Sequence, residues 1–148
     1  MLVKDYMTTE VTALQETDSL LDAAMIFVRS SFRHVPVVRD KKVVGIITER
    51  DVKQFAPSLL SRTSAEEYNQ VMETTPISRV MTREPAVLTP NQPVFDAATV
   101  LHSKRVGCMP VVENGELVGI ITTTDLLGLL IQIMQEKGVG GSKPPASS

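Results

Sequence analysis

The sequence contains one pattern twice, and this repetition constrains its fold more than any local feature does. Shifting the chain by 74 residues superimposes identical residues along both copies without a gap. The matched segments are Met7 with Met81, Asp22-Ala23-Ala24 with Asp96-Ala97-Ala98, Pro36-Val37-Val38 with Pro110-Val111-Val112, Gly45-Ile46-Ile47-Thr48 with Gly119-Ile120-Ile121-Thr122, and Asp51 with Asp125. An internal repeat indicates that the two copies form the same elements and bury their apolar faces together.

Each copy predicts a short strand, a helix, two strands and a second helix. Apolar residues recur at helical spacing in both copies. They are Leu20, Ala23, Ala24, Phe27 and Val28 in the first, and Val94, Ala97, Ala98 and Leu101 in the second. The β-branched runs "VPVV" with "KVVGIIT" and "MPVV" with "LVGIIT" are separated by turn-like residues, so each pair predicts a hairpin. We therefore expect an α+β fold with two small sheets, each covered by helices on one face.

The chain divides into two repeats joined by a connector. We assign residues 1–56 to the first repeat, 57–75 to a helical linker and 76–136 to the second repeat. Ser64 and Glu67 form a capping-box pattern in the linker, which predicts a helix there. The tail, residues 137–148, is rich in Gly, Ser and Pro, and we expect it to be disordered.

Composition restricts the class of protein. Apolar residues make up 43% of the 148 residues and charged residues 22%, as in globular proteins. With 15 basic and 17 acidic side chains, no excess charge indicates nucleic acid or a membrane as a partner. The longest apolar stretch, "LLGLLIQIM", is shorter than the roughly 18 residues of a membrane span. Cys108 is the only cysteine, so no internal disulfide forms, and a cytoplasmic location fits best.

The sequence offers no pattern for catalysis or metal binding. His34 and His102 lack further His or Cys residues at ligand spacing. Cys108 has no partner that indicates a nucleophile, so we expect a small buried residue. Gly45 and Gly119 lack the context of a phosphate-binding loop and indicate a close approach of chains or a bulge. We expect neither an enzyme nor a cofactor.

Two similar endings, "GIITERD" and "GIITTTD", have two interpretations. Thr48 with Asp51, and Thr122 with Asp125, match the capping box, in which these side chains satisfy the N–H groups at a helix start. The same groups are also suited to ligand contacts. The residues alone leave both interpretations open, because a duplicated helix carries its cap with it.

Together these motifs resemble the paired cystathionine β-synthase (CBS) domain, or Bateman module. The resemblance rests on "DYMT" and "RVMT", the Asp-Ala-Ala helix, "HVPVV" and "CMPVV", and Gly-Ile-Ile-Thr followed by Asp, and it covers residues 1 to about 135. It implies two β-α-β-β-α repeats packed about a pseudo-twofold axis. It also implies a non-enzymatic sensor with two clefts for adenosine-containing ligands.

The resemblance implies that the Thr and Asp of each ending contact the ligand. An aspartate accepts hydrogen bonds from a ribose diol, and a Thr hydroxyl with the N–H groups of a helix start receives phosphate. The full implied ligand-binding set is Thr48, Arg50, Asp51, Thr122, Asp125, Arg33, His34, Ala13, Val87, Val35, Pro36, Met109 and Pro110. Cations gather in the first copy, so we expect its cleft to hold a phosphorylated ligand more tightly. We assign Lys104 and Arg105 instead to stabilising a helix end.

The expected function is a stand-alone regulatory module that binds AMP, ADP, ATP or S-adenosylmethionine and modulates an unknown protein partner. The alternative is a protein-interaction or dimerisation module with vestigial clefts. A homodimer is expected in either case, because the C-terminal helix carries a wide apolar stripe. Its residues are Leu126, Leu127, Leu130, Ile131 and Met134, widened by Leu129 and Ile133.

Overall fold

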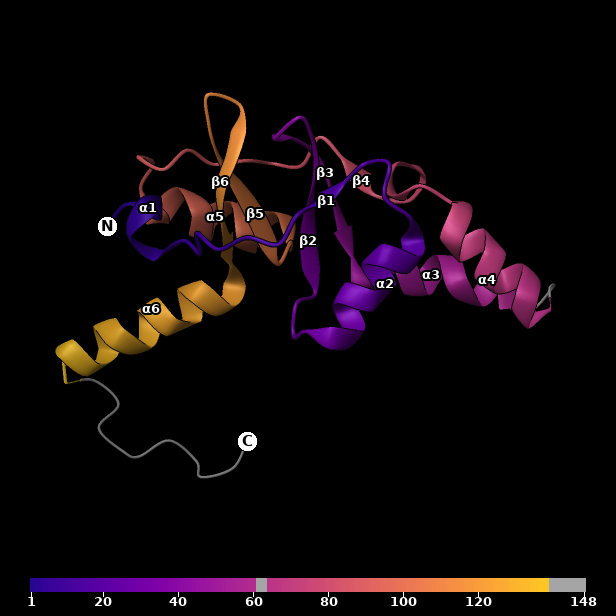
Figure 1. Ribbon diagram of the computed structural model, residues 1–148. Coiled ribbons are helices and arrows are strands. Elements are labelled where there is room, and N and C mark those ends of the chain that lie inside the picture. Colours follow the sequence, from indigo (N-terminus) through magenta and orange to yellow (C-terminus); the bar gives the residue numbers. More distant parts are fainter. Residues whose placement is uncertain (61–63, 139–148) are drawn as a thin grey trace.

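The computed structural model describes residues 1–60 and 64–138, so the expected disorder of residues 139–148 lies outside the described residues. The first copy contains β1 (Leu14–Gln15), α2 (Leu20–Arg29), β2 (His34–Arg39), β3 (Lys42–Thr48) and α3 (Glu49–Leu60). The second contains α5 (Val94–Lys104), β5 (Cys108–Glu113), β6 (Glu116–Thr122) and α6 (Thr123–Glu136). Helix α1 (Val3–Tyr6) begins the first copy, α4 (Ala65–Thr74) lies in the linker, and the 3-10 helix η1 (Ile77–Arg79) and β4 (Thr82–Arg83) begin the second copy. The predicted α+β fold is confirmed (Figure 1).

The two hairpins have the same register. In β2–β3, His34 lies opposite Thr48, and the register shifts between Val37 and Val38. The β5–β6 hairpin repeats both features, with Cys108 opposite Thr122 and a shift between Val111 and Val112. The parallel pairing of β1 with β2 is reduced in the second copy to one bridge, between Leu88 and Val111. Each hairpin therefore delivers its threonine to the start of the following helix in the same way.

The hairpins join at their turn ends. Lys42 of β3 pairs with Glu116 of β6, and the Leu117 N–H donates to the Lys41 carbonyl at 3.0 Å. The strands thus follow one path, β1-β2-β3-β6-β5, with β4 also paired to β3. This differs from the two separate sheets that the sequence predicts. The reason is that the turn ends of the two hairpins meet, so that β3 and β6 each offer a strand edge to the other.

Each copy opens with a segment that pairs with the last strand before the second helix of the other copy. We call these two opening segments the crossing segments. In β4, Thr82 lies opposite Ile46 of β3, and Thr8 forms the equivalent bridge to Ile120 of β6. Helix α1 lies beside α5, and its Val3 is buried in the core of the second copy (Figure 1). Ile77 and Met81 are buried in the core of the first copy. Each core is therefore completed by a segment that belongs, in sequence, to the other copy.

Gly45 and Gly119 allow the crossing segments to pass. A Cβ atom at position 45 would lie 2.6 Å from Met81 Sδ and 2.8 Å from the Thr82 carbonyl oxygen. At position 119 it would lie 2.7 Å from Met7 Sδ and 3.0 Å from the carbonyl oxygen of Thr8. The close approach predicted for these glycines is confirmed.

Two apolar clusters form the cores, and a third links the halves. Leu20, Ala23 and Phe27 of α2 belong to the first cluster, and Ala97 and Leu101 of α5 to the second. The predicted helix faces were too wide, because Val28 and Ala98 are exposed. The linking cluster consists of Ile46, Cys108 and Ile120, so the prediction that Cys108 is buried is confirmed.

Candidate functional site

Two clefts lie between the copies, and both combine one copy's hairpin end with the other's crossing segment. The first cleft has a volume of about 1010 Å³ and is lined by the start of α3, Thr82, residues 84–86 and residues 104–109. The second cleft has a volume of about 370 Å³ and is lined by the start of α6, Thr8, residues 10–12 and residues 31–34. Thr48 and Thr82 line the first cleft, and their counterparts Thr122 and Thr8 line the second. The sequence repeat has thus produced two related sites.

Both helix starts are closed by capping boxes. The Thr48 N–H donates to Asp51 Oδ2 at 3.0 Å, and the Asp51 N–H donates to Thr48 Oγ1 at 3.0 Å. Thr122 and Asp125 repeat these bonds at 2.9 and 3.1 Å. Neither aspartate is among the residues that line the clefts. Both endings therefore form the capping boxes that one of the two interpretations predicts.

These bonds use only one oxygen of each aspartate. Among the described residues, no buried side-chain oxygen or nitrogen lacks a hydrogen-bond partner. Oδ1 of Asp51 and of Asp125 takes no part in the capping boxes, in which only Oδ2 of each carboxylate accepts a hydrogen bond. A cap and a ligand contact can therefore use different oxygens of one carboxylate.

The clefts differ strongly in charge. Of the described residues, those lining the first cleft include five cations, namely Arg33, Arg50, Lys53, Lys104 and Arg105, against the carboxylates Glu49 and Glu84. The charged residues lining the second cleft are Arg33 and Glu10. A concave surface with one predominant sign concentrates ligands of the opposite sign. The first cleft is thus built for an anionic group.

Three of these cations were not among the ligand-binding residues expected from the sequence. Lys104 and Arg105 end α5, which is why we assigned them to its dipole, but they also line the first cleft. Lys53 lies one turn after Glu49 on α3, and this i,i+4 spacing is a signal that could have indicated it. The missing information was which copy's helix end faces which cleft.

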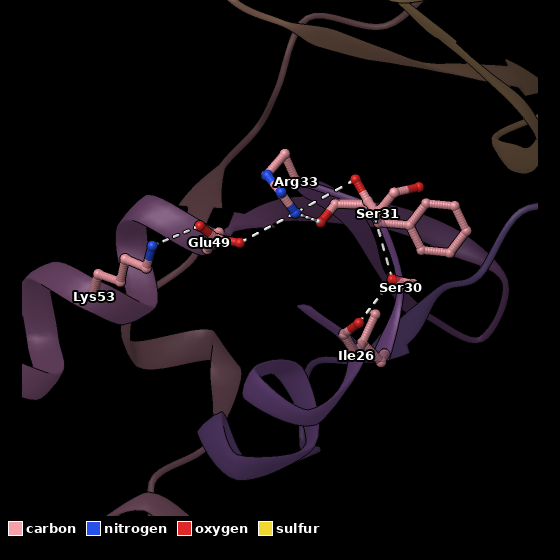
Figure 2. A network of polar contacts seen from close by, with 7 residues as sticks. Ile26, Ser30, Ser31, Arg33, Glu49 and Lys53 are labelled. Carbon is pink, nitrogen blue, oxygen red and sulfur yellow. Dashed lines mark hydrogen bonds and ion pairs between the residues drawn. The ribbon is translucent and has the colours of Figure 1, made fainter. Parts of the chain in front are cut away.

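Glu49 connects two cations at the wall of the first cleft. Its Oε2 lies 3.3 Å from Arg33 Nη1, and its Oε1 accepts a hydrogen bond from Lys53 Nζ at 2.7 Å (Figure 2). Arg33 Nη1 also donates to the carbonyl oxygens of Phe32, at 3.1 Å, and Ser31, at 3.4 Å. The hydrogen bond from Lys53 is the main cause that lowers the pKa of Glu49, and the charge of Arg33 lowers it further.

His34 and Cys108 occupy equivalent positions at the junction of the clefts. His34 lines both clefts, and a Cβ atom on Gly107 would lie 2.7 Å from its Cε1, so a side chain at position 107 would displace the ring. Burial lowers the pKa of His34, and the charge of Asp51 partly opposes this. Burial, with a smaller contribution from Asp125, raises the pKa of the Cys108 thiol to about 12, so the thiol stays protonated at neutral pH.

A comparison with known families identifies the repeated unit. The family model for the CBS domain matches residues 3–58 and 77–132. The chain belongs to the CBS domain family. Its two CBS domains follow one another in tandem, as the sequence motifs predict, which confirms the predicted resemblance.

Individual relatives of this CBS domain pair agree with that assignment. A CBS domain-containing protein of Dictyostelium discoideum is 30% identical over 138 residues, which cover 91% of this chain and 94% of that protein. The solved structure of AcuB from Vibrio cholerae matches with a TM-score of 0.76 and 30% identity, over 97% of this chain and 98% of that one. The CBS domain pair of protein MJ0100, solved with 5′-methylthioadenosine and S-adenosyl-L-methionine, matches with a TM-score of 0.73 and 26% identity. This match covers 90% of the present chain and 98% of the solved one.

The residues expected to bind a ligand fall into three groups in this CBS domain pair. Those lining a cleft are Arg33, His34, Thr48, Arg50 and Met109 in the first, and Arg33, His34, Pro36 and Thr122 in the second. Val35 and Pro110 are fully buried and line neither cleft. Ala13 and Val87 are exposed and line neither cleft, and Asp51 and Asp125 cap their helices. The ligand contacts of all these residues stay predictions.

Two other properties of the CBS domain pair concern the described part of the chain. No group of three or more His, Cys, Asp or Glu side chains within residues 1–60 and 64–138 is placed to hold a metal ion. Over the same ranges, every helix is too short or too polar to cross a bilayer.

Proposed function

We propose that this CBS domain pair is a regulatory module that binds an adenosine-containing ligand between its repeats and modulates a protein partner. The observation that carries the proposal is the first cleft, where five cations surround the start of α3. The N–H groups of a helix start and nearby cations together form a site for phosphate. Ile46, Val106 and Met109 supply apolar surface in the same cleft, which suits a purine.

The proposed ligands are AMP, ADP, ATP and S-adenosylmethionine, which share an adenosine. The solved MJ0100 pair contains two adenosyl compounds, and this likeness supports the same ligand class here. In our proposal Oδ1 of Asp51 accepts from the ribose hydroxyls, while Oδ2 continues to cap α3. The second cleft, being smaller and nearly neutral, binds phosphorylated members of the class less tightly.

A thermal-shift panel tests the proposed ligand class. The four compounds, together with adenosine and 5′-methylthioadenosine, are added to purified protein from which nucleotides have been removed. A ligand at 100 times its Kd adds about 2.7 kcal/mol to the free energy of unfolding, which raises the melting temperature by several degrees. The proposal predicts such a shift with at least one compound, and no shift with any of them would contradict it.

A second candidate function is a dimerisation or protein-interaction module whose clefts are vestigial. It is favoured by α6, on which Leu127, Leu130, Ile131 and Met134 are all exposed, with Ile131 at 57%. An uncovered apolar stripe of this kind indicates a partner surface, and we propose that a second copy of the chain covers it. A dimer that binds no adenosyl compound would favour this candidate over the first.

We further propose that the protein is non-enzymatic and cytoplasmic. The described part of each cleft combines cations, a helix start and apolar surface, but it holds no nucleophile with an adjacent base. Cys108, with its raised pKa, is unsuited to that role. Neither nucleic acid nor a membrane is a proposed partner, because the overall charge of the chain is close to balanced.

A further inference from the structure

One carboxylate in the first cleft, that of Glu49, forms ion pairs with two of the cations that line the cleft. Glu49 contacts Arg33 at 3.3 Å and Lys53 at 2.7 Å, one with each carboxylate oxygen (Figure 2). Its side chain is 25% exposed, against 59% for Arg33 and 73% for Lys53. Glu49 is therefore the most enclosed member of this trio, and the two cations reach inward to it.

The trio holds the donors that a phosphate would use. Guanidinium and ammonium groups bind carboxylate and phosphate through the same N–H donors. Arg33 Nη1 is held by Glu49 and by the carbonyl oxygens of Phe32 and Ser31, so the guanidinium is fixed at the cleft wall before any ligand arrives. A phosphate that binds Arg33 or Lys53 must compete with the Glu49 carboxylate.

The second copy lacks this arrangement entirely. The residues equivalent to Arg33, Glu49 and Lys53 are Gly107, Thr123 and Leu127. Yet the capping box of α6 has nearly the same bond lengths as that of α3. The trio is thus not needed to form the helix start, and it is a separate feature of the first cleft.

We propose that Glu49 is a specificity-determining residue of the first cleft, acting as a built-in competitor of the ligand's phosphates. It weakens the binding of phosphorylated adenosyl ligands and leaves the binding of uncharged adenosine unchanged. The proposal rests on the proposed function, because it requires an adenosyl ligand in this cleft. The first cleft therefore binds phosphate less tightly than it would if its five cations acted without Glu49.

The test compares Glu49→Gln with wild-type protein by calorimetric titration of ATP and of adenosine. Buffers without divalent cations keep the phosphate charge on ATP. Exposed ion pairs are individually weak, so releasing two cations tightens ATP binding only modestly, about three- to tenfold. Adenosine affinity stays within about twofold, because adenosine carries no charge to compete with the carboxylate. Circular dichroism confirms that the variant is folded.

Glu84→Gln is the matched control. Glu84 lines the same cleft, but within residues 1–60 and 64–138 it forms no ion pair, and its removal changes the net charge equally. Screening limits such a purely long-range effect, so we expect a gain for ATP of about twofold or less. Lys53→Met gives a further check, because it should remove the part of the gain that Lys53 supplies in the Glu49→Gln background and leave the part due to Arg33.

The outcomes separate the two proposals. Unchanged or weaker ATP binding in Glu49→Gln, an equal gain in Glu84→Gln, or an equal gain for adenosine would overturn the role of Glu49 while the cleft remains a ligand site. Absence of binding of both ATP and adenosine to wild type and to every variant would overturn the role of Glu49, whereas the proposed function is overturned only if no compound of the thermal-shift panel binds.

Discussion

Asp51 caps helix α3, and we propose that it also contacts the ligand. Its Oδ2 accepts the N–H of Thr48 at 3.0 Å and so closes the start of α3, whereas its Oδ1 takes no part in the cap. The sequence motif alone cannot separate these roles, because both require the same residue types at the same spacing. They differ in what a substitution does to affinity, and this difference can be measured.

Asp51→Ala is expected to lower both stability and affinity. Loss of the cap costs about 1 kcal/mol of the free energy of unfolding. If Oδ1 accepts from a ribose diol, the loss of two charge-assisted hydrogen bonds weakens adenosyl-ligand affinity about a hundredfold. Urea denaturation measures the first effect and calorimetric titration the second.

Asp22→Ala is the control for this change. Asp22 and Ser19 form the same capping box at the start of α2, with bonds of 3.0 and 3.2 Å, and Asp22 lies outside both clefts. Its removal should cost a similar amount of stability and leave affinity unchanged. Equal affinities in the two variants and in wild type would mean that Asp51 is only a helix cap.

His34 makes the stability of the protein depend on pH. Because burial lowers its pKa, the folded protein binds this proton less tightly than the unfolded chain, where the pKa is about 6.5. The unfolded state therefore takes up the proton first as the pH falls, and the free energy of unfolding decreases from pH 7.5 to pH 5.5. In His34→Gln this decrease should be smaller. Urea denaturation at several pH values measures it, with the exposed His102 replaced by Gln as a control that should keep the wild-type slope.

At the scale of elements, β3 and β6 have no room for a side chain at Gly45 and Gly119, where the crossing segments pass. Gly45→Ala and Gly119→Ala would push against Met81 or Met7, which can move, and against the backbone carbonyl of Thr82 or Thr8, which cannot move freely. Each substitution should lower the free energy of unfolding by about 1–3 kcal/mol. Thermal or urea denaturation measures the loss.

Gly128 provides the contrasting element. It lies within α6. A Cβ atom at position 128 would have no described atom within 4 Å, apart from its chain neighbours and the nearby backbone of its own helix. Gly128→Ala should therefore stabilise the protein by about 0.5–1 kcal/mol through helix propensity. If all three alanine variants changed stability equally, close packing would not explain the glycines of β3 and β6.

The elements themselves were predictable because their signals are local. Hairpin register follows from two β-branched runs around a turn, and the cap of α4 follows from Ser64, whose hydroxyl accepts the Glu67 N–H. The crossing segments and the joining of the hairpins were not predicted, since they depend on contacts between distant residues such as Thr8 with Ile120. Val28 shows the same limit, because helical spacing indicates a stripe but not where the neighbouring element ends.

For the molecule as a whole, duplication explains why two clefts exist, and divergence explains why they differ. The pairing of β2 with β3 and of β5 with β6 is equivalent throughout, so the backbone frames of the clefts are alike. The charges that separate them come from side chains at equivalent positions, such as Arg50 and Thr124. The sequence therefore predicted which cleft is more basic. It did not predict the extent of that difference, because Lys104 and Arg105 reach the first cleft from the other copy.

The apolar stripe of α6 predicts that two such molecules pair. Leu127 and Ile131 are 55% and 57% exposed, and covering this stripe with a second copy would remove apolar surface from water on both chains. Ile131→Lys places a charge in the centre of the stripe and should shift the protein from dimer to monomer in sedimentation experiments at tens of micromolar. Gln132→Lys adds the same charge on the opposite side of the helix and should leave the dimer intact. A monomeric wild-type protein at that concentration, or equal dissociation of both variants, would show that a second copy does not cover α6.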